Sequence, residues 1–205
     1  MLDCAGAAAL LREWDQILVM SHASPDGDTL GSASGLLWGL KSLGKQVDFY
    51  CADPVPEKFS SLFEGLELGG FAPQHVMTVD VADKKLLGKE TPQELKDRVE
   101  LAIDHHATHV DFAQERWVEA ESAATTELIY LLLQEMGVQV DSRMAACLCS
   151  APPRLFSNYL ATFSQKRMKI AATCARIAEP SGARVVSVTP LSRPSPTAHC
   201  MALLA

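Results

Sequence analysis

The feature that most constrains the fold is an alternation of short apolar runs with helical segments along the first 150 residues. The apolar runs predict buried strands at 16–21, 46–50, 75–82 and 99–106. Periodicity and capping residues predict helices at 5–14, 29–43, 91–98 and 122–136, and a further helix that Asp141 N-caps and that runs to about Cys149. Buried strands that alternate with helices predict an α/β fold, with a parallel sheet and helices on both of its faces.

The composition is ordinary for a globular protein of one domain. The chain has 205 residues, of which 48% are hydrophobic and 6% aromatic, enough to bury a core. No charged segment followed by an apolar one opens the sequence, and no apolar run approaches the roughly 18 residues of a membrane span. We therefore expect a cytoplasmic protein without a membrane partner. The six cysteines include no C-x-x-C pair, which predicts reduced thiols, with Cys147 and Cys149 filling the core.

Charge divides the chain into two unlike parts. Residues 1–150 hold 11 Lys and Arg against 24 Asp and Glu, whereas residues 151–205 hold 7 against 1. The second part also carries six of the eleven prolines. A basic tail is compatible with nucleic-acid binding, but no aromatic residues are interleaved with its charges. We expect one domain over 1–150 and an atypical, poorly packed tail over 151–205.

Acids and histidines follow three of the predicted strands. They are His22, Asp26 and Asp28 after the first strand, Asp80 at the end of the third, and Asp104, His105 and His106 after the fourth. A single aspartate at a strand end is more often a cap or turn former than a ligand. However, the carboxyl ends of parallel strands meet at one edge of the sheet, so these groups should converge. Carboxylates with imidazoles and without thiolates suit Mn²⁺ or Mg²⁺ better than a structural zinc.

The turn after the first strand is suited to such a site. Gly27 allows a tight turn between two aspartates, and the amides that open the helix at Thr29 are expected to cradle a phosphate.

These motifs resemble those of a known family. The segment H-x-x-P-D-G-D-x-x-G-S at 22–32, V-D at 79–80 and D-H-H at 104–106 resemble the first three motifs of the DHH phosphoesterases. The S-A-A-T-T-E segment at 122–127 is most similar to the branch of small oligoribonucleases that also dephosphorylate 3′-phosphoadenosine 5′-phosphate. The resemblance covers about residues 1–150.

The resemblance implies a pair of Mn²⁺ ions, with Mg²⁺ as a possible substitute. His22, Asp26 and Asp80 would hold one ion, and Asp28, His105 and the bridging Asp80 would hold the other. A metal-activated water would then attack phosphorus in line.

The other residues of the motifs would handle substrate and protons. Asp104 would orient an imidazole, and His106 would contact the scissile phosphate or protonate the leaving oxygen. Ser32 and His109 are assigned to substrate binding, although a solvated surface histidine is an equal reading of His109.

The chain departs from the family after about Cys149. The family's fourth aspartate, in a T-D-T-G-like loop, and its separate substrate-binding domain with a GGGH-like segment have no counterpart in the sequence. Natural divergence or a shift of reading frame would each produce this pattern. We therefore expect the C-terminal substrate domain to be missing, the second metal site to be weakened and the activity to be impaired.

The resemblance implies a Mn²⁺-dependent phosphoesterase that hydrolyses short oligoribonucleotides or 3′,5′-bisphosphonucleotides. One alternative is the same site acting on a cyclic dinucleotide or pyrophosphate, although Gly27 stands where the superfamily's pyrophosphatases usually have threonine. The other is a degenerate domain that binds nucleotide or metal without turnover. The expected partners are a short RNA or nucleotide substrate, and a homodimer is compatible with the sequence.

Overall fold

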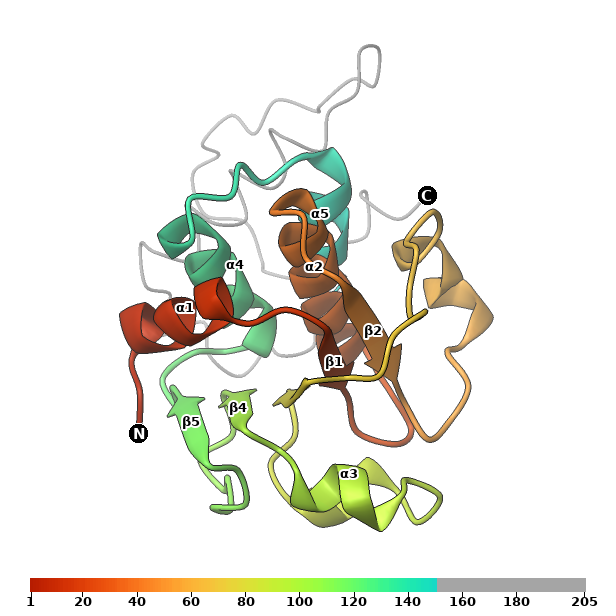
Figure 1. Ribbon diagram of the computed structural model, residues 1–205, viewed down its shortest axis with the longest axis vertical. Coiled ribbons are helices and arrows are strands. Elements are labelled where there is room, and N and C mark those ends of the chain that lie inside the picture. The colour runs from red at the N-terminus through yellow and green to blue at the C-terminus, as the bar shows by residue number, and fades with distance from the viewer. Residues whose placement is uncertain (151–205) are drawn as a thin grey trace, which may run out of the picture.

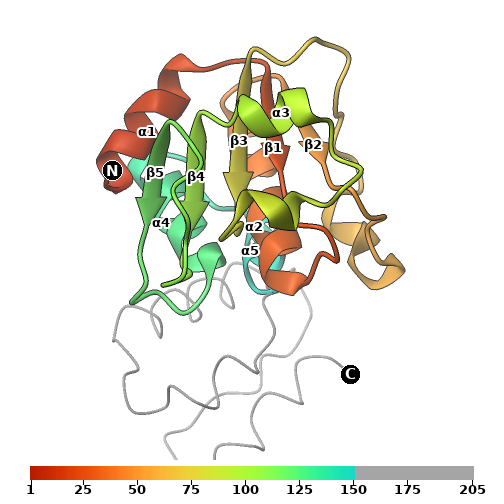
Figure 2. The ribbon, with the colours of Figure 1, turned by 90° about the horizontal axis from the view of Figure 1, so that it is seen from below.

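A parallel five-stranded sheet organises the protein in a computed structural model that describes residues 1–150. The strands are β1 (Ile17–Met20), β2 (Val47–Tyr50), β3 (His75–Val79), β4 (Leu101–Asp104) and β5 (Glu115–Val118). They lie in the order β2-β1-β3-β4-β5, and each neighbouring pair is parallel. The carboxyl ends of the strands therefore share one edge of the sheet (Figures 1 and 2).

The helices include those that the sequence predicts. They are α1 (Cys4–Glu13), α2 (Gly27–Ser42), α3 (Gln93–Asp97), α4 (Thr125–Glu135) and α5 (Ser142–Leu148), with 3-10 helices η1 (Glu57–Leu62) and η2 (Lys84–Leu87). Asp141 caps α5 as predicted, because its carboxylate accepts a hydrogen bond from the Met144 amide. Helix α2 begins at Gly27, two residues before the predicted start, since Asp26 is its N-cap.

The two faces of the sheet are covered unequally. Alternate residues of each strand point to opposite faces, so Ile17 and Val19 join a large core beneath α1, α2, α4 and α5. Leu18 and Met20 point the other way and pack in a smaller cluster, against which Leu95 of α3 lies. Figure 2 shows α3 on the opposite side of the sheet from α2 and α4. The predicted α/β class, with helices on both faces, is confirmed.

Gly31, Gly35 and Gly39 follow one another at four-residue spacing in α2 and let this helix approach its neighbours closely. A Cβ atom at Gly31 would lie 2.4 Å from the backbone oxygen of Cys147 in α5, which is too close for any side chain. At Gly39 it would lie 2.1 Å from Leu133 of α4. Helices α4 and α5 thus pack tightly on α2, and this fixes where the α4 N-terminus meets the start of α2.

Strand β5, the cysteines and the tail complete the comparison with the sequence. Strand β5 is not among the predicted strands, and the predictions for the tail at 151–205 concern residues outside those that the structure describes. Cys147 is buried, as expected for a core residue, whereas Cys149 is exposed at the end of α5, so the expectation that it fills the core is wrong. Within residues 1–150, none of the helices has the length and apolar character needed to cross a membrane.

Candidate metal centre

The predicted site residues gather at the carboxyl edge of the sheet, around the ends of β1 and β3. In this strand order the chain turns to opposite sides after β1 and β3, and open α/β sheets bind ligands at that point. His22 follows β1, Asp80 follows β3, Asp104 ends β4 with His105 and His106 behind it, and Asp26 and Asp28 begin α2. The topology thus brings together residues that are distant in sequence.

His22, Asp26 and Asp80 form the first group that could hold a cation. Their ligand atoms all lie within 4.8 Å of one another, and His22 Nε2 is 3.8 Å from Asp80 Oδ2. His22 Nδ1 lies 2.7 Å from the Ala23 carbonyl oxygen, so Nδ1 is the donor nitrogen and Nε2 is the nitrogen that faces Asp80. Asp26 Oδ1 accepts hydrogen bonds from two amides at the start of α2, which holds this carboxylate in place.

The same two bonds change the expectation for a phosphate cradle. The amides of Asp28 and Thr29 donate to Asp26 Oδ1 at 2.9 and 3.1 Å. Both are therefore already satisfied, and they are not available to a phosphate as predicted.

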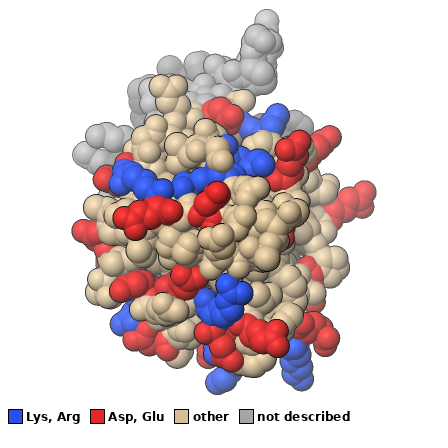
Figure 3. All heavy atoms as spheres, viewed as in Figure 1, with Lys and Arg blue, Asp and Glu red and all other residues tan. Residues whose placement is uncertain are grey.

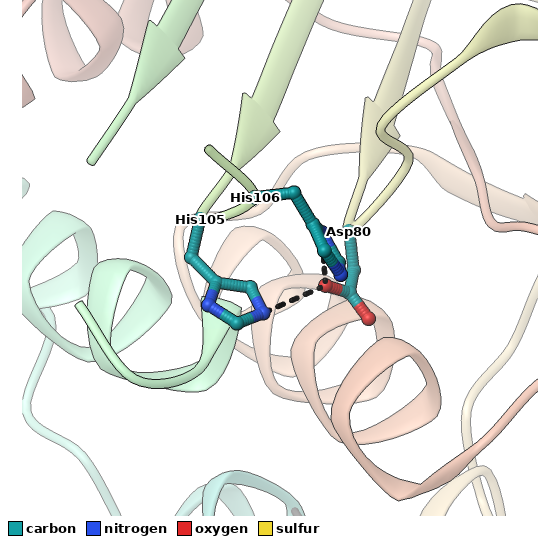
Figure 4. A group of neighbouring side chains, drawn as sticks. All are labelled: Asp80, His105 and His106. Carbon is teal, nitrogen blue, oxygen red and sulfur yellow. Dashed lines mark ion pairs between the residues drawn. The ribbon is translucent and has the colours of Figure 1, made fainter. Parts of the chain in front are cut away.

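The second group contains Asp80, His105 and His106 (Figure 4). His105 Nε2 lies 3.8 Å from Asp80 Oδ1, and its Nδ1 lies 3.1 Å from the Ser122 carbonyl oxygen, which sets the tautomer. Asp80 belongs to both groups, and its bridging of two ions stays a prediction. His105 Nε2 is also 3.5 Å from Asp28 Oδ2, the third ligand that the sequence predicts.

Asp80 has an unusual backbone conformation. Its φ is +60°, in the left-handed region that non-glycine residues rarely adopt, and its amide donates to the Ile103 carbonyl at 2.9 Å. The Thr125 hydroxyl donates to Asp80 Oδ1 at 2.8 Å. Strained residues of this kind persist where surrounding bonds hold them, and they cluster at functional sites.

Asp28 lies against the N-terminus of α4. Its two carboxylate oxygens accept hydrogen bonds from the amides of Thr125 and Thr126 at 3.0 and 3.1 Å. The Ser32 hydroxyl lies 3.5 Å from Asp28 Oδ1, and the Ser32 side chain is fully buried. In this structure Ser32 thus supports Asp28, and its assignment to substrate binding stays a prediction.

Burial of two neighbouring acids gives the site a need for positive charge. Asp28 and Asp80 are each only 3% exposed. Burial raises the pKa of Asp80 to about 7, and burial together with the nearby Asp80 charge raises the pKa of Asp28 to about 7. A divalent cation among these carboxylates would offset both effects, and the oxygen and imidazole donors fit Mn²⁺ or Mg²⁺.

Asp104 is clamped between two histidines. It is fully buried, and His106 Nδ1 and His109 Nδ1 lie 2.7 and 2.8 Å from its two oxygens. Burial alone would raise the pKa of Asp104, but the hydrogen bonds from His106 and His109 outweigh it and lower the pKa below the usual range. The hydrogen bond to Asp104 raises the pKa of His106 to about 9, although burial of His106 acts in the opposite direction. Asp104 is thus hydrogen-bonded to the His106 ring, and its role in catalysis stays a prediction.

His109 is not a solvated surface histidine. Its side chain is 4% exposed, and its Nε2 is a buried atom without a hydrogen-bond partner among the described residues. Its predicted contact with phosphate stays a prediction.

The sequence did not reveal that residues at and just before the start of α4 form hydrogen bonds with the site residues. The Ser122 carbonyl oxygen contacts His105, the Thr125 hydroxyl donates to Asp80, and the Thr126 amide donates to Asp28. The S-A-A-T-T-E motif is the signal, although its pattern alone indicates a helix start and not these bonds.

The acidic character of the described residues is visible on the face shown in Figure 3, where acidic side chains lie from top to bottom with basic ones between them.

This chain matches one part of several longer known proteins. The bifunctional oligoribonuclease and PAP phosphatase NrnA of Thermus thermophilus is 31% identical over 138 residues, which are 63% of this chain and 40% of that protein. The uncharacterized protein MG371 of Mycoplasma genitalium is 25% identical over 146 residues, or 67% of this chain and 44% of that protein. The matched region thus spans less than half the length of these relatives.

A solved structure and a family profile agree with the geometry. An exopolyphosphatase-related protein from Bacteroides fragilis superimposes with a TM-score of 0.70 at 19% identity, over 86% of this chain and 57% of that one, which shows a shared fold. Residues 16–151 match the profile of the DHH family, N-terminal domain, and this span contains both cation-binding groups. The chain therefore belongs to the DHH family.

Proposed function

We propose that residues 1–150 form the catalytic unit of a metal-dependent phosphoesterase. The observation that carries this proposal is the position of Asp80, which belongs to both donor groups at the edge of the sheet where α/β proteins bind ligands. A shared carboxylate between two groups of ligands suits a pair of cations. We expect Mn²⁺, with Mg²⁺ as a substitute.

His22, Asp26 and Asp80 would hold the first cation, and Asp80 with His105 the second. We assign Asp28 rather than His106 as the third ligand of the second cation, because the His106 Nδ1 atom near Asp80 already bonds Asp104 at 2.7 Å. Bound there, the cations would neutralise charge on the phosphate and acidify the attacking water.

His106 is the residue best suited to move a proton. Its pKa of about 9 keeps the imidazole protonated near neutral pH, and Asp104 fixes the ring through Nδ1. His106 Nε2 is then available to donate to a phosphate oxygen or to the leaving oxygen. Asp104 stays ionised, because its pKa lies below the usual range, and it therefore stabilises the charged form of His106.

We propose short oligoribonucleotides or 3′,5′-bisphosphonucleotides as substrates. The 31% identical relative carries both activities in its name, which supports this class. Cyclic dinucleotides or pyrophosphate remain the alternative substrates, and a non-catalytic nucleotide- or metal-binding domain is the alternative function. A cytoplasmic location and a homodimer stay predictions of the sequence.

A hydrolysis screen with Mn²⁺ tests the proposal. Bis(p-nitrophenyl) phosphate, 3′-phosphoadenosine 5′-phosphate, a trinucleotide RNA, a cyclic dinucleotide and pyrophosphate would be incubated with the full chain and with a chelator control. Turnover of the first three would support the assignment, and turnover of only the last two would move it to the alternative substrates. No turnover of any compound would favour the non-catalytic domain.

Metal binding provides a separate test. Because the expected fourth aspartate of the family has no counterpart in the sequence, calorimetric titration of metal-free protein should give one tight Mn²⁺ site and one much weaker site. Two equally tight sites would contradict the predicted impairment. A protein that binds no Mn²⁺ would contradict the metal centre itself.

A further inference from the structure

A small pocket lies beside the first cation group. Its volume is about 210 Å³, and its lining includes Pro25, Asp26 and Gly27 from the turn after β1 and Pro56, Lys58 and Phe59 from the start of η1. Ligand pockets for drug-sized molecules measure roughly 300–1,000 Å³, so this pocket has room for about one ring system. Because Asp26 is both a lining residue and a candidate ligand, an occupant would lie next to a phosphate at the metal centre.

The η1 segment that forms one wall is tied to the core. Trp38 Nε1 of α2 donates to the Leu62 carbonyl at 3.1 Å, and the Cys147 thiol of α5 lies 3.7 Å from the same oxygen. Just after η1, the Phe63 ring packs on Phe49 of β2 with centroids 4.9 Å apart. Phe59 is therefore presented from an anchored element.

The side chains of this wall suit a flat aromatic ligand that carries negative charge. Phe59 is only partly buried, and the Lys58 ammonium lies 4.8 Å from the centroid of its ring. The prolines at 25 and 56 add apolar surface. Every nucleobase has a π-face that can stack on an aromatic side chain, and an ammonium beside the ring can pair with a phosphate.

We propose that this pocket binds the nucleobase of a nucleotide whose phosphate lies at the metal centre, with Phe59 as the stacking surface and Lys58 as a phosphate contact. The inference rests on the proposed function for the position of the phosphate. It adds a reason for preferring a nucleotide over pyrophosphate or another phosphate without a base.

Equilibrium binding measures this preference without any need for turnover. Calorimetry with Mn²⁺ would compare adenosine 5′-monophosphate with ribose 5-phosphate, which has the same phosphate and sugar but no base. We expect the wild type to bind the nucleotide about tenfold or more tightly than ribose 5-phosphate, as a stacked base implies. Phe59→Ala should reduce this ratio to within about twofold of unity.

Matched variants separate stacking from general damage. Phe59→Trp should keep the preference because it retains a stacking surface, and Glu57→Ala, an exposed change in the same element, should leave it unaltered. Lys58→Ala should weaken both ligands several-fold, whereas Lys58→Arg should restore them. Thermal melts would show that each variant is folded.

The outcomes distinguish this inference from the proposed function. Equal affinity of the wild type for both ligands, no binding of either ligand, or an unchanged ratio in Phe59→Ala would each overturn the base pocket. Hydrolysis of bis(p-nitrophenyl) phosphate by the same protein would still support the catalytic centre. A base preference that Phe59→Ala abolishes, in a protein that hydrolyses nothing, would support the pocket and refute the activity.

Discussion

Replacement of Asp80 by asparagine should stabilise the metal-free protein, and the gain should grow as the pH rises. Asp80 is 3% exposed, and burial raises its pKa from 3.8 to about 7. Between these two values the folded chain keeps a proton that the unfolded chain has released, so the free energy of unfolding falls as the pH rises. An asparagine side chain carries no charge at any of these pH values and would not contribute to this loss.

The size of the effect follows from the shift in pKa. One pKa unit corresponds to about 1.4 kcal/mol, so a shift from 3.8 to about 7 corresponds to something on the order of 4 kcal/mol at most. At about pH 5 the folded carboxyl is still protonated but the unfolded one has ionised, so the variant should be more stable by only about 1.5 kcal/mol. At about pH 8 the variant should be more stable by a few kcal/mol.

Asp104→Asn is the matched control, with the opposite sign. Asp104 is also buried at the same edge of the sheet, but its ionised carboxylate accepts bonds from His106 and His109. Its pKa lies below the usual range, so it contributes stability above about pH 4 that is lost on acidification. Hydrogen bonds to charged groups are worth about 1.5–3 kcal/mol, and Asp104→Asn should therefore destabilise the fold at both pH values.

Urea unfolding in EDTA at about pH 5 and pH 8 measures both variants. Addition of Mn²⁺ should raise the stability of the wild type and much less that of Asp80→Asn, because a ligand that binds only the folded state stabilises it. If the wild type is active, the variant should also lose several orders of magnitude in kcat. Stability of Asp80→Asn below that of the wild type at pH 8, or retention of more than about a tenth of kcat, would refute the reasoning.

Three further substitutions test the surroundings of the acids. Thr125→Val removes the hydroxyl that donates to Asp80. In metal-free protein it should lower the free energy of unfolding by about 1.5–3 kcal/mol at pH 8 and by less at pH 5. Equal losses at the two pH values in urea unfolding would contradict a bond to an ionised carboxylate. Gly31→Ala places a Cβ 2.4 Å from a backbone oxygen of α5 and should cost about 1–3 kcal/mol or more by calorimetry, so an unchanged Tm would show that the helices can separate without cost. His109→Leu leaves a buried oxygen of Asp104 without its donor and should cost about 1.5–3 kcal/mol, whereas His109→Asn should retain part of that stability; identical losses would argue against the hydrogen bond.

The parallel sheet and the gathering of acids could be predicted because both follow from local patterns. Four strands appear in the sequence as apolar runs, and the residues after them converge wherever strands run parallel. The edge strand β5, with sequence E-R-W-V, escaped prediction because only Trp117 of its four residues is buried. An edge strand has fewer neighbours to cover it and needs no continuous apolar run.

The hydrogen-bond partners of the acids could not be predicted, because they depend on how helices pack. The amide of Thr126 reaches Asp28 across 98 positions of sequence, and this requires α4 to begin beside α2. The positive φ of Asp80 likewise has no local signal, since aspartate does not require that conformation. Only the assembled edge of the sheet fixes these features.

Helix packing and the electrostatics of the site are coupled through Gly31. A Cβ at this position would lie 3.4 Å from the Thr126 methyl carbon, one residue after the threonine that bonds Asp80. The absence of a side chain there lets the α4 N-terminus come close enough to donate two amides to Asp28. Those amides partly compensate a buried carboxylate before any cation binds. The glycine in the first motif, G-S at 31–32, thus acts through packing on the same acids that the rest of the motif supplies.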